Sequence, residues 1–145
     1  MFKKVLSLGV FLISSPLFAN ELTSFDAIVA ALSSGKQVSA VLHAKQCKVT
    51  DPNEIKFLPS SGFVRIDSAL FTEDKLGFDV TKYARAIPTI APNGLMQRAS
   101  FILEKNGQLN GVIASFDAVT NVKPANRKDV TVDCKLGDSV HFYLN

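Results

Sequence analysis

The chain has 145 residues, 47% of them hydrophobic, and a formal net charge of +3. This length fits one domain of ordinary size, which buries a core without help from a metal. Lysine and arginine do not cluster with interleaved aromatic residues, so the sequence gives no support to nucleic-acid binding.

The first 19 residues have the pattern of a secretory signal peptide. Lys3 and Lys4 form a short positive region, and an almost wholly apolar run follows as far as Ile13. Pro16 breaks this run before Ala19, after which we expect cleavage. The alternative, a membrane anchor, would need about 20 apolar residues without such a break.

We therefore expect a signal peptide at residues 1–19 and a single domain at residues 20–145. Without Lys3 and Lys4, 14 basic residues face 13 acidic residues, so the working protein is close to neutral. This organisation predicts a periplasmic or secreted protein with no membrane anchor after cleavage.

One amphipathic helix is predicted between Leu22 and Gly35. Thr23 and Ser24 are both good N-cap residues, and Gly35 is a typical stop. Apolar residues recur at intervals of three and four, as expected for a helix that packs on a core. This apolar stripe consists of Phe25, Ile28, Val29 and Leu32.

The rest of the chain has the alternation of strands. Gln37 to Ala44 and Phe63 to Thr72 alternate, with a loop from Thr50 to Gly62 between them. In the second strand we expect Val64, Ile66 and Leu70 on one face. Pro88 and Pro92 limit any strand from Ala84 to Pro92 to an edge. Near the C-terminus, two further alternating segments place Val130, Val132 and Cys134, and then Val140, Phe142 and Leu144, toward the core.

Asn106-Gly107 predicts the clearest hairpin, because this pair favours a two-residue type I′ turn. The turn would place Phe101 opposite Val112 and Ala99 opposite Ala114. The buried face of the hairpin would then contain Ala99, Phe101, Leu103, Val112, Ala114 and Phe116. Together these segments predict an α+β fold. One N-terminal amphipathic helix packs on a twisted, mostly antiparallel sheet of about six to eight strands, with a closed barrel as the alternative.

The two cysteines, Cys47 and Cys134, are expected to form a disulfide, because an exported chain meets an oxidising compartment. Two alternatives use the same residues. With His43 and His141 the cysteines make a possible four-ligand zinc set, although the spacing is not that of a zinc finger. Alternatively, Cys47 and His43 could act as a nucleophile and its base, which would require a reduced thiol.

Polar residues suggest one further weak site. Arg65 and Asp67 share a strand face, and with His43 they are the best candidates for a polar binding or catalytic site. Two charges at a spacing of two residues are also typical of a solvated strand face. The sequence has no nucleophile elbow, phosphate loop or metalloprotease motif, so we assign no catalytic residue and no cofactor.

The order of four segments resembles the VirK family of small bacterial exported proteins. After the export signal come SFDAIVAALSSGK and QVSAVLHAKQC, then GFVRIDSALF in mid-chain and TVDCKLGDSVHFYL at the end. The resemblance implies a periplasmic or secreted protein associated with virulence loci. It implies no established reaction, and we transfer no site residue from it.

The sequence leaves several functions open. The first is an exported binding or accessory protein, whose curved sheet holds an unidentified small molecule or protein partner. The second is a small periplasmic or secreted enzyme of hydrolase type, and the third is a secreted effector directed at a host. The enzyme hypothesis requires His43, Arg65 and Asp67 to converge in a cleft.

Overall fold

The computed structural model describes residues 20–50, 62–84, 92–125 and 127–145. The expected signal peptide, most of the loop expected from Thr50 to Gly62 and most of the segment from Ala84 to Pro92 lie outside these residues. The elements in chain order are β1 (Asn20–Leu22), α1 (Phe25–Ser33), β2 (Val38–Leu42), the short 3-10 helix η1 (Ala44–Gln46), β3 (Lys48–Val49), β4 (Gly62–Ile66), β5 (Ala69–Phe71), β6 (Lys75–Ala84), β7 (Leu95–Glu104), β8 (Gln108–Asp117), β9 (Val130–Lys135) and β10 (Val140–Leu144).

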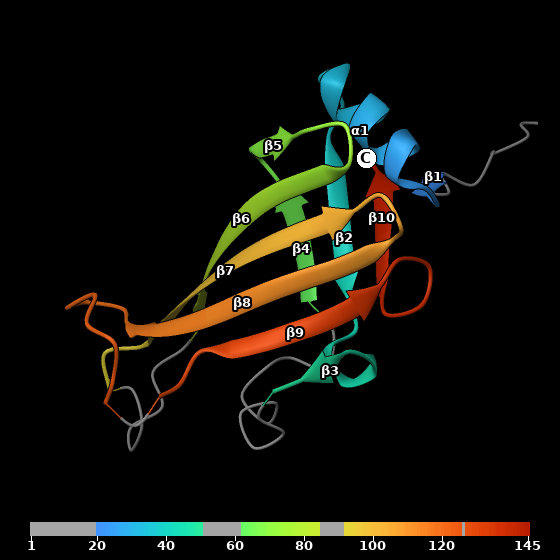
Figure 1. The fold of residues 1–145 in the computed structure, drawn as a ribbon. Coiled ribbons are helices and arrows are strands. Elements are labelled where there is room, and N and C mark those ends of the chain that lie inside the picture. Colours follow the sequence, from blue (N-terminus) through green and yellow to red (C-terminus); the bar gives the residue numbers. More distant parts are fainter. Residues whose placement is uncertain (1–19, 51–61, 85–91, 126) are drawn as a thin grey trace, which may run out of the picture.

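The strands form two sheets, and the core lies between them. One sheet has the order β1-β10-β2-β4, the other has the order β3-β9-β8-β7-β6-β5, and neighbouring strands are antiparallel in both. Figure 1 shows that β2, β4 and β10 run across the strands of the six-stranded sheet. The expected α+β class with a mostly antiparallel sheet is confirmed. The described residues contain more strands than expected, and these strands are divided between two sheets that do not close into a barrel.

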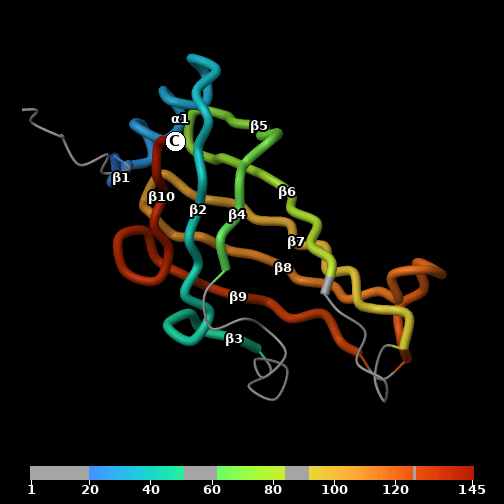
Figure 2. The backbone as a smooth tube through the Cα atoms, turned by 180° about the vertical axis from the view of Figure 1, so that it is seen from behind, coloured from blue at the N-terminus to red at the C-terminus, as the bar shows by residue number. Residues whose placement is uncertain are grey.

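The two sheets are not joined between β4 and β6, which belong to different sheets and do not pair with each other. These strands lie close together near β5 and diverge toward their other ends (Figure 2). The side-chain ammonium of Lys82 on β6 donates a hydrogen bond to the carbonyl oxygen of Phe63 on β4. One side chain therefore bridges the gap between the two sheet edges.

The helix α1 covers one end of the space between the sheets (Figure 1). It begins at Ser24, whose hydroxyl accepts a hydrogen bond from the backbone N–H of Ala27 at 3.2 Å. Phe25, Ile28 and Ala31 are buried, and Gly35 adopts a φ of +74° just beyond the helix. The predicted helix is confirmed, and among the described residues no helix is long and apolar enough to cross a membrane.

The register of the β7–β8 hairpin differs from the expected one by one residue. Phe101 lies opposite Gly111, and Ala99 lies opposite Ile113. The loop contains three residues, because Gly107 donates its N–H to the carbonyl of Glu104 and adopts a φ of +86°. A slip of one residue turns every side chain of a strand to the other face, so the expected inward position of Val112 is wrong.

The segment expected as one strand from Phe63 to Thr72 is two strands in different sheets. The chain leaves the four-stranded sheet after Ile66 and joins β6 through β5. The inward and outward alternation of side chains in β5 is therefore independent of that in β4. The expectation that Ile66 and Leu70 share a face is wrong. Ile66 is buried, whereas the side chain of Leu70 is 85% exposed.

The C-terminal strands follow the predicted alternation. Every second residue of β9 is buried, as are Val140 and Phe142 on β10, and Leu144 packs against the same core. The buried residues of β9 are Val130, Val132 and Cys134. The inward position of Cys134 brings its side chain within reach of the segment that follows β2.

Candidate functional site

Cys47 and Cys134 form a disulfide in the structure. The sulfur–sulfur distance is 2.11 Å, and the two Cα atoms lie 4.6 Å apart. Cys47 lies between η1 and β3, and Cys134 lies on β9, the strand that pairs with β3, so the disulfide links two neighbouring strands of the six-stranded sheet. Both the zinc and the nucleophile hypotheses need thiolates, which the disulfide removes. Among the described residues, no group of three or more His, Cys, Asp or Glu side chains is arranged to hold a metal.

Two of the three polar candidates are paired with each other. Arg65 Nε lies 2.6 Å from Asp67 Oδ1, and the two side chains are 55% and 69% exposed. His43 lies elsewhere. Arg65 is opposite Ser39 on β2, and His43 lies four residues after Ser39, just beyond the end of β2. Four residues of strand span about 13 Å. The structure therefore does not bring His43 together with Arg65 and Asp67.

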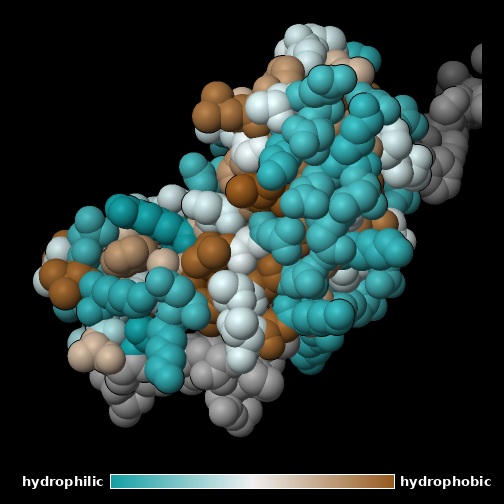
Figure 3. Space-filling view, viewed as in Figure 1, coloured by the Kyte–Doolittle hydropathy of each residue, from teal (hydrophilic) through white to brown (hydrophobic). Residues whose placement is uncertain are grey.

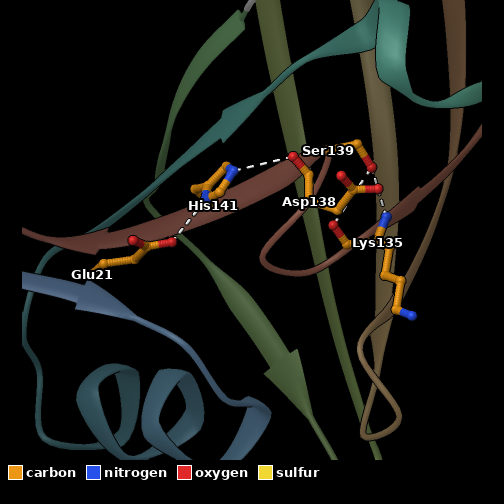
Figure 4. A network of polar contacts seen from close by, with 5 residues as sticks. All are labelled: Glu21, Lys135, Asp138, Ser139 and His141. Atoms are coloured by element: carbon orange, nitrogen blue, oxygen red, sulfur yellow. Dashed lines mark hydrogen bonds and ion pairs between the residues drawn. The ribbon is translucent and has the colours of Figure 1, made fainter.

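His43 instead approaches His141 on β10, with the two rings edge to face and their centroids 5.8 Å apart. His141 is the centre of a polar network that sequence reasoning missed (Figure 4). Its Nδ1 lies 2.6 Å from Glu21 Oε1, and its Nε2 lies 3.2 Å from the carbonyl oxygen of Asp138. Glu21 and His141 are 120 residues apart, and no local motif links them.

The pKa of His141 is raised above its ordinary value, chiefly because Glu21 holds the protonated ring by a hydrogen bond. Partial burial opposes this effect. Next to His141, the buried Ser139 hydroxyl accepts a hydrogen bond from the N–H of Lys135 at 2.8 Å. The serine hydroxyl therefore stabilises the turn between β9 and β10. We interpret the network as a structural one that holds β1 and this turn against β10.

A cavity between the two sheets is the better candidate for a functional site. It opens between β4 and β6 and has a volume of about 70 Å³. Its surface is almost wholly apolar, and it is lined by Leu42, Ala44, Gly62, Val64, Val80, Lys82, Gln97, Ala99, Phe101 and Ile113. These residues come from both sheets, so the cavity depends on the way the sheets face each other.

Two neighbouring pairs on β6 and β7, together with Phe101 of a third pair, form one wall of this cavity. Phe78 lies opposite Phe101, Val80 lies opposite Ala99, and Lys82 lies opposite Gln97. Since they are spaced by two residues, all six side chains lie on the same face of the sheet. The rings of Phe78 and Phe101 stack at a centroid distance of 5.3 Å, and both residues belong to the buried core.

The outer face of the six-stranded sheet is a weaker candidate for a binding site than the cavity. It exposes Leu70, Ile102 and Val112, which are 85%, 48% and 45% exposed. Figure 3 shows apolar groups on this face interspersed with polar ones. Scattered apolar residues of this kind are common on protein surfaces and do not define a binding site.

Comparison with protein families places this fold among known proteins. The family model described as VirK protein matches residues 21–132. The chain belongs to the VirK family. A crystal structure of a VirK family protein from Legionella pneumophila has the same fold, with a TM-score of 0.69 and 19% sequence identity. The match covers 85% of this VirK chain and 98% of the Legionella chain. Comparison with curated proteins found no match.

Proposed function

We propose that this VirK-family chain is an exported binding protein that holds the apolar part of a small ligand between its two sheets. The observation that carries the proposal is the apolar cavity, which opens to the surface between β4 and β6. Its volume of about 70 Å³ is smaller than the range of about 300–1,000 Å³ that is typical of small-molecule sites, so the cavity would hold only part of a ligand. Its apolar walls with a few polar groups are typical of such sites.

Two observations support export. Residues 1–19 have the signal-peptide pattern, and the Cys47–Cys134 disulfide is of the kind that persists in oxidising compartments. Mass spectrometry of the non-reduced exported protein tests both. We expect a mass that begins near Asn20 and lacks two hydrogens. Detection in the periplasm or in the culture supernatant distinguishes a periplasmic protein from a secreted effector.

The enzyme hypothesis has less support. It required His43, Arg65 and Asp67 to converge in a cleft. Arg65 and Asp67 instead pair on an exposed strand face, and His43 lies beside His141. None of the three lines the cavity, so a binding role accounts for more of the structure than a hydrolytic role.

Calorimetric titration of the exported, oxidised protein with straight-chain alcohols from hexanol to decanol tests the binding proposal. If the chain enters the cavity, each added methylene tightens binding by up to about fourfold, because burial of a methylene contributes about 0.8 kcal/mol. A ligand that binds only at the surface would show little dependence on chain length.

A pair of matched variants locates the binding. Ala99→Leu places three extra carbons in the cavity, whereas Ala114→Leu adds the same group to the other face of the same sheet. We expect Ala99→Leu to weaken decanol binding at least tenfold and Ala114→Leu to leave it unchanged. Equal binding by the two variants, with equal melting temperatures, would refute the cavity as the site.

A further inference from the structure

We propose that the ligand of this cavity is an anionic amphiphile, with a single hydrocarbon chain between the sheets and a carboxylate head group at Lys82 and Gln97. The proposal rests on the proposed function and adds the chemical class of the ligand. It is argued from the order of side chains along the cavity wall and from the charge at its mouth.

Polarity changes in one direction along the wall. The Phe78–Phe101 pair is buried, the Val80–Ala99 pair is half-buried, and the Lys82–Gln97 pair follows at the gap between β4 and β6. Facing residues on neighbouring strands have Cβ atoms about 4.5–5.5 Å apart, so Lys82 and Gln97 can donate to one acceptor group. An amphipathic molecule matches this gradient better than a wholly apolar molecule, which would leave the polar pair without a partner.

The charge at the mouth favours an anion. Lys82 is the only charged residue among the described residues that line the cavity. An ammonium has three donors, and in the described part of the chain its one hydrogen bond is to the Phe63 carbonyl oxygen. No acidic side chain among the described residues forms an ion pair with Lys82, and Asp67, which follows β4, is paired with Arg65. A carboxylate would therefore supply the counter-charge that Lys82 lacks.

The position of Lys82 also explains how a ligand would engage both sheets. Lys82 belongs to β6 and reaches across the gap to Phe63 on β4. Hydrogen bonds in which both groups are charged are stronger than those to a neutral carbonyl. An incoming carboxylate thus has an advantage over the Phe63 oxygen, and the hydrocarbon chain behind it contacts Val64 of β4 and Val80 of β6.

Three ligands with one chain length test the head group. The exported, oxidised protein is titrated at pH 8 with decanoate, decanol and decyltrimethylammonium, each below its critical micelle concentration. We expect decanoate to bind roughly fivefold more tightly than decanol, as for a solvent-accessible ion pair, and decyltrimethylammonium to bind more weakly than decanol. Adding salt should reduce the preference for decanoate and leave decanol binding unchanged.

Substitutions at two lysines of the same strand provide the control. Lys82→Met should abolish the preference for decanoate over decanol, and Lys82→Arg should retain the preference. Lys75→Met, at the other end of β6 and outside the cavity lining, should leave all three affinities unchanged. Melting temperatures verify that the variants are folded, as expected for changes at exposed positions.

The outcomes separate this inference from the function on which it rests. If decanol and decanoate bind equally, or if Lys82→Met leaves their ratio unchanged, the head-group assignment is wrong and the apolar binding function stands. If none of the three ligands binds, both proposals are wrong. Preferential binding of decanoate that depends on Lys82 supports the assignment.

Discussion

Glu21 and His141 join the two ends of the domain, because the Glu21 carboxylate lies 2.6 Å from the His141 ring nitrogen. β1 is the edge strand of its sheet, with three residues paired to β10. A short edge strand depends strongly on its side-chain contacts, because it has few backbone hydrogen bonds. The contact therefore links the charge of His141 to the attachment of β1.

Glu21→Gln should destabilise the protein in a pH-dependent way. The pKa of His141 is raised in the folded state, so its stabilising effect is fully present below the unfolded value near 6.5. The effect is lost as the pH rises through the folded pKa. We expect a decrease of up to about 1 kcal/mol in the unfolding free energy at pH 6, and a much smaller decrease at pH 8.5. Urea denaturation at the two pH values measures the difference.

Glu73→Gln is the control for this experiment, because it removes the same charge from an exposed turn. It should change the unfolding free energy by similar small amounts at both pH values. A Glu21→Gln effect that is equal at pH 6 and pH 8.5 would show that His141 protonation does not contribute.

Removal of the disulfide should destabilise the fold far more than loss of any one surface ion pair. Cys47 and Cys134 are separated by 87 residues, and the chain-entropy model assigns about 4–5 kcal/mol to a loop of this length. We expect a Cys47→Ser, Cys134→Ser double variant to lose stability of that order in urea denaturation. Addition of a thiol reductant should lower the wild-type midpoint and leave the double variant unchanged. A shared midpoint for reduced and oxidised wild type would contradict the cross-link.

Gly111 has no room for a side chain. A Cβ atom at this position would lie 2.4 Å from Cδ1 of Phe101, which is its cross-strand partner. Gly111→Ala should therefore cost about 1–3 kcal/mol through overpacking. Gly77→Ala, in the same sheet, brings its Cβ only to ordinary contact distances and should change stability by about 0.5 kcal/mol or less. Equal melting temperatures of the two variants would contradict the predicted clash.

The two candidate caps of α1 can be distinguished by substitution. The Ser24 hydroxyl accepts the Ala27 N–H, whereas Thr23 precedes the cap. Ser24→Ala should lower the unfolding free energy by about 1 kcal/mol, and Thr23→Ala should have a much smaller effect. Chemical denaturation of the two variants provides the comparison. A larger loss of stability for Thr23→Ala than for Ser24→Ala would contradict the assignment of Ser24 as the cap.

Local sequence patterns predicted those elements whose structure depends on residues close together in the sequence. The cap, apolar stripe and terminal glycine of α1 lie within 12 residues, and the parity of β9 alone placed Cys134 inward. The hairpin shows where such reasoning fails. Asn106-Gly107 marked the turn, yet Lys105 also belongs to the loop, and this one residue reverses the buried face of β8. Nothing within the turn itself distinguishes the two loop lengths.

The candidate site was outside the reach of sequence patterns. The cavity is lined from five strands and η1, and its apolar residues look like ordinary core in each strand. Only the division of the chain into two sheets at Asp67 and Ser68 leaves them facing a gap. Likewise, Glu21 and His141 are brought together by the pairing of β1 with β10, which depends on the whole fold.

The placement of the disulfide puts the covalent link at one side of the six-stranded sheet. Cys47 directly precedes β3, and Cys134 lies on β9, the strand that pairs with β3. In the order of the sheet β9 is three strands away from β6, so the bond lies on the side away from the gap between β4 and β6. At that gap the Lys82 side chain bridges the two sheets by a hydrogen bond. Oxidation of the two cysteines therefore secures the two-residue strand β3 on β9 and adds no covalent link at the edge that borders the cavity.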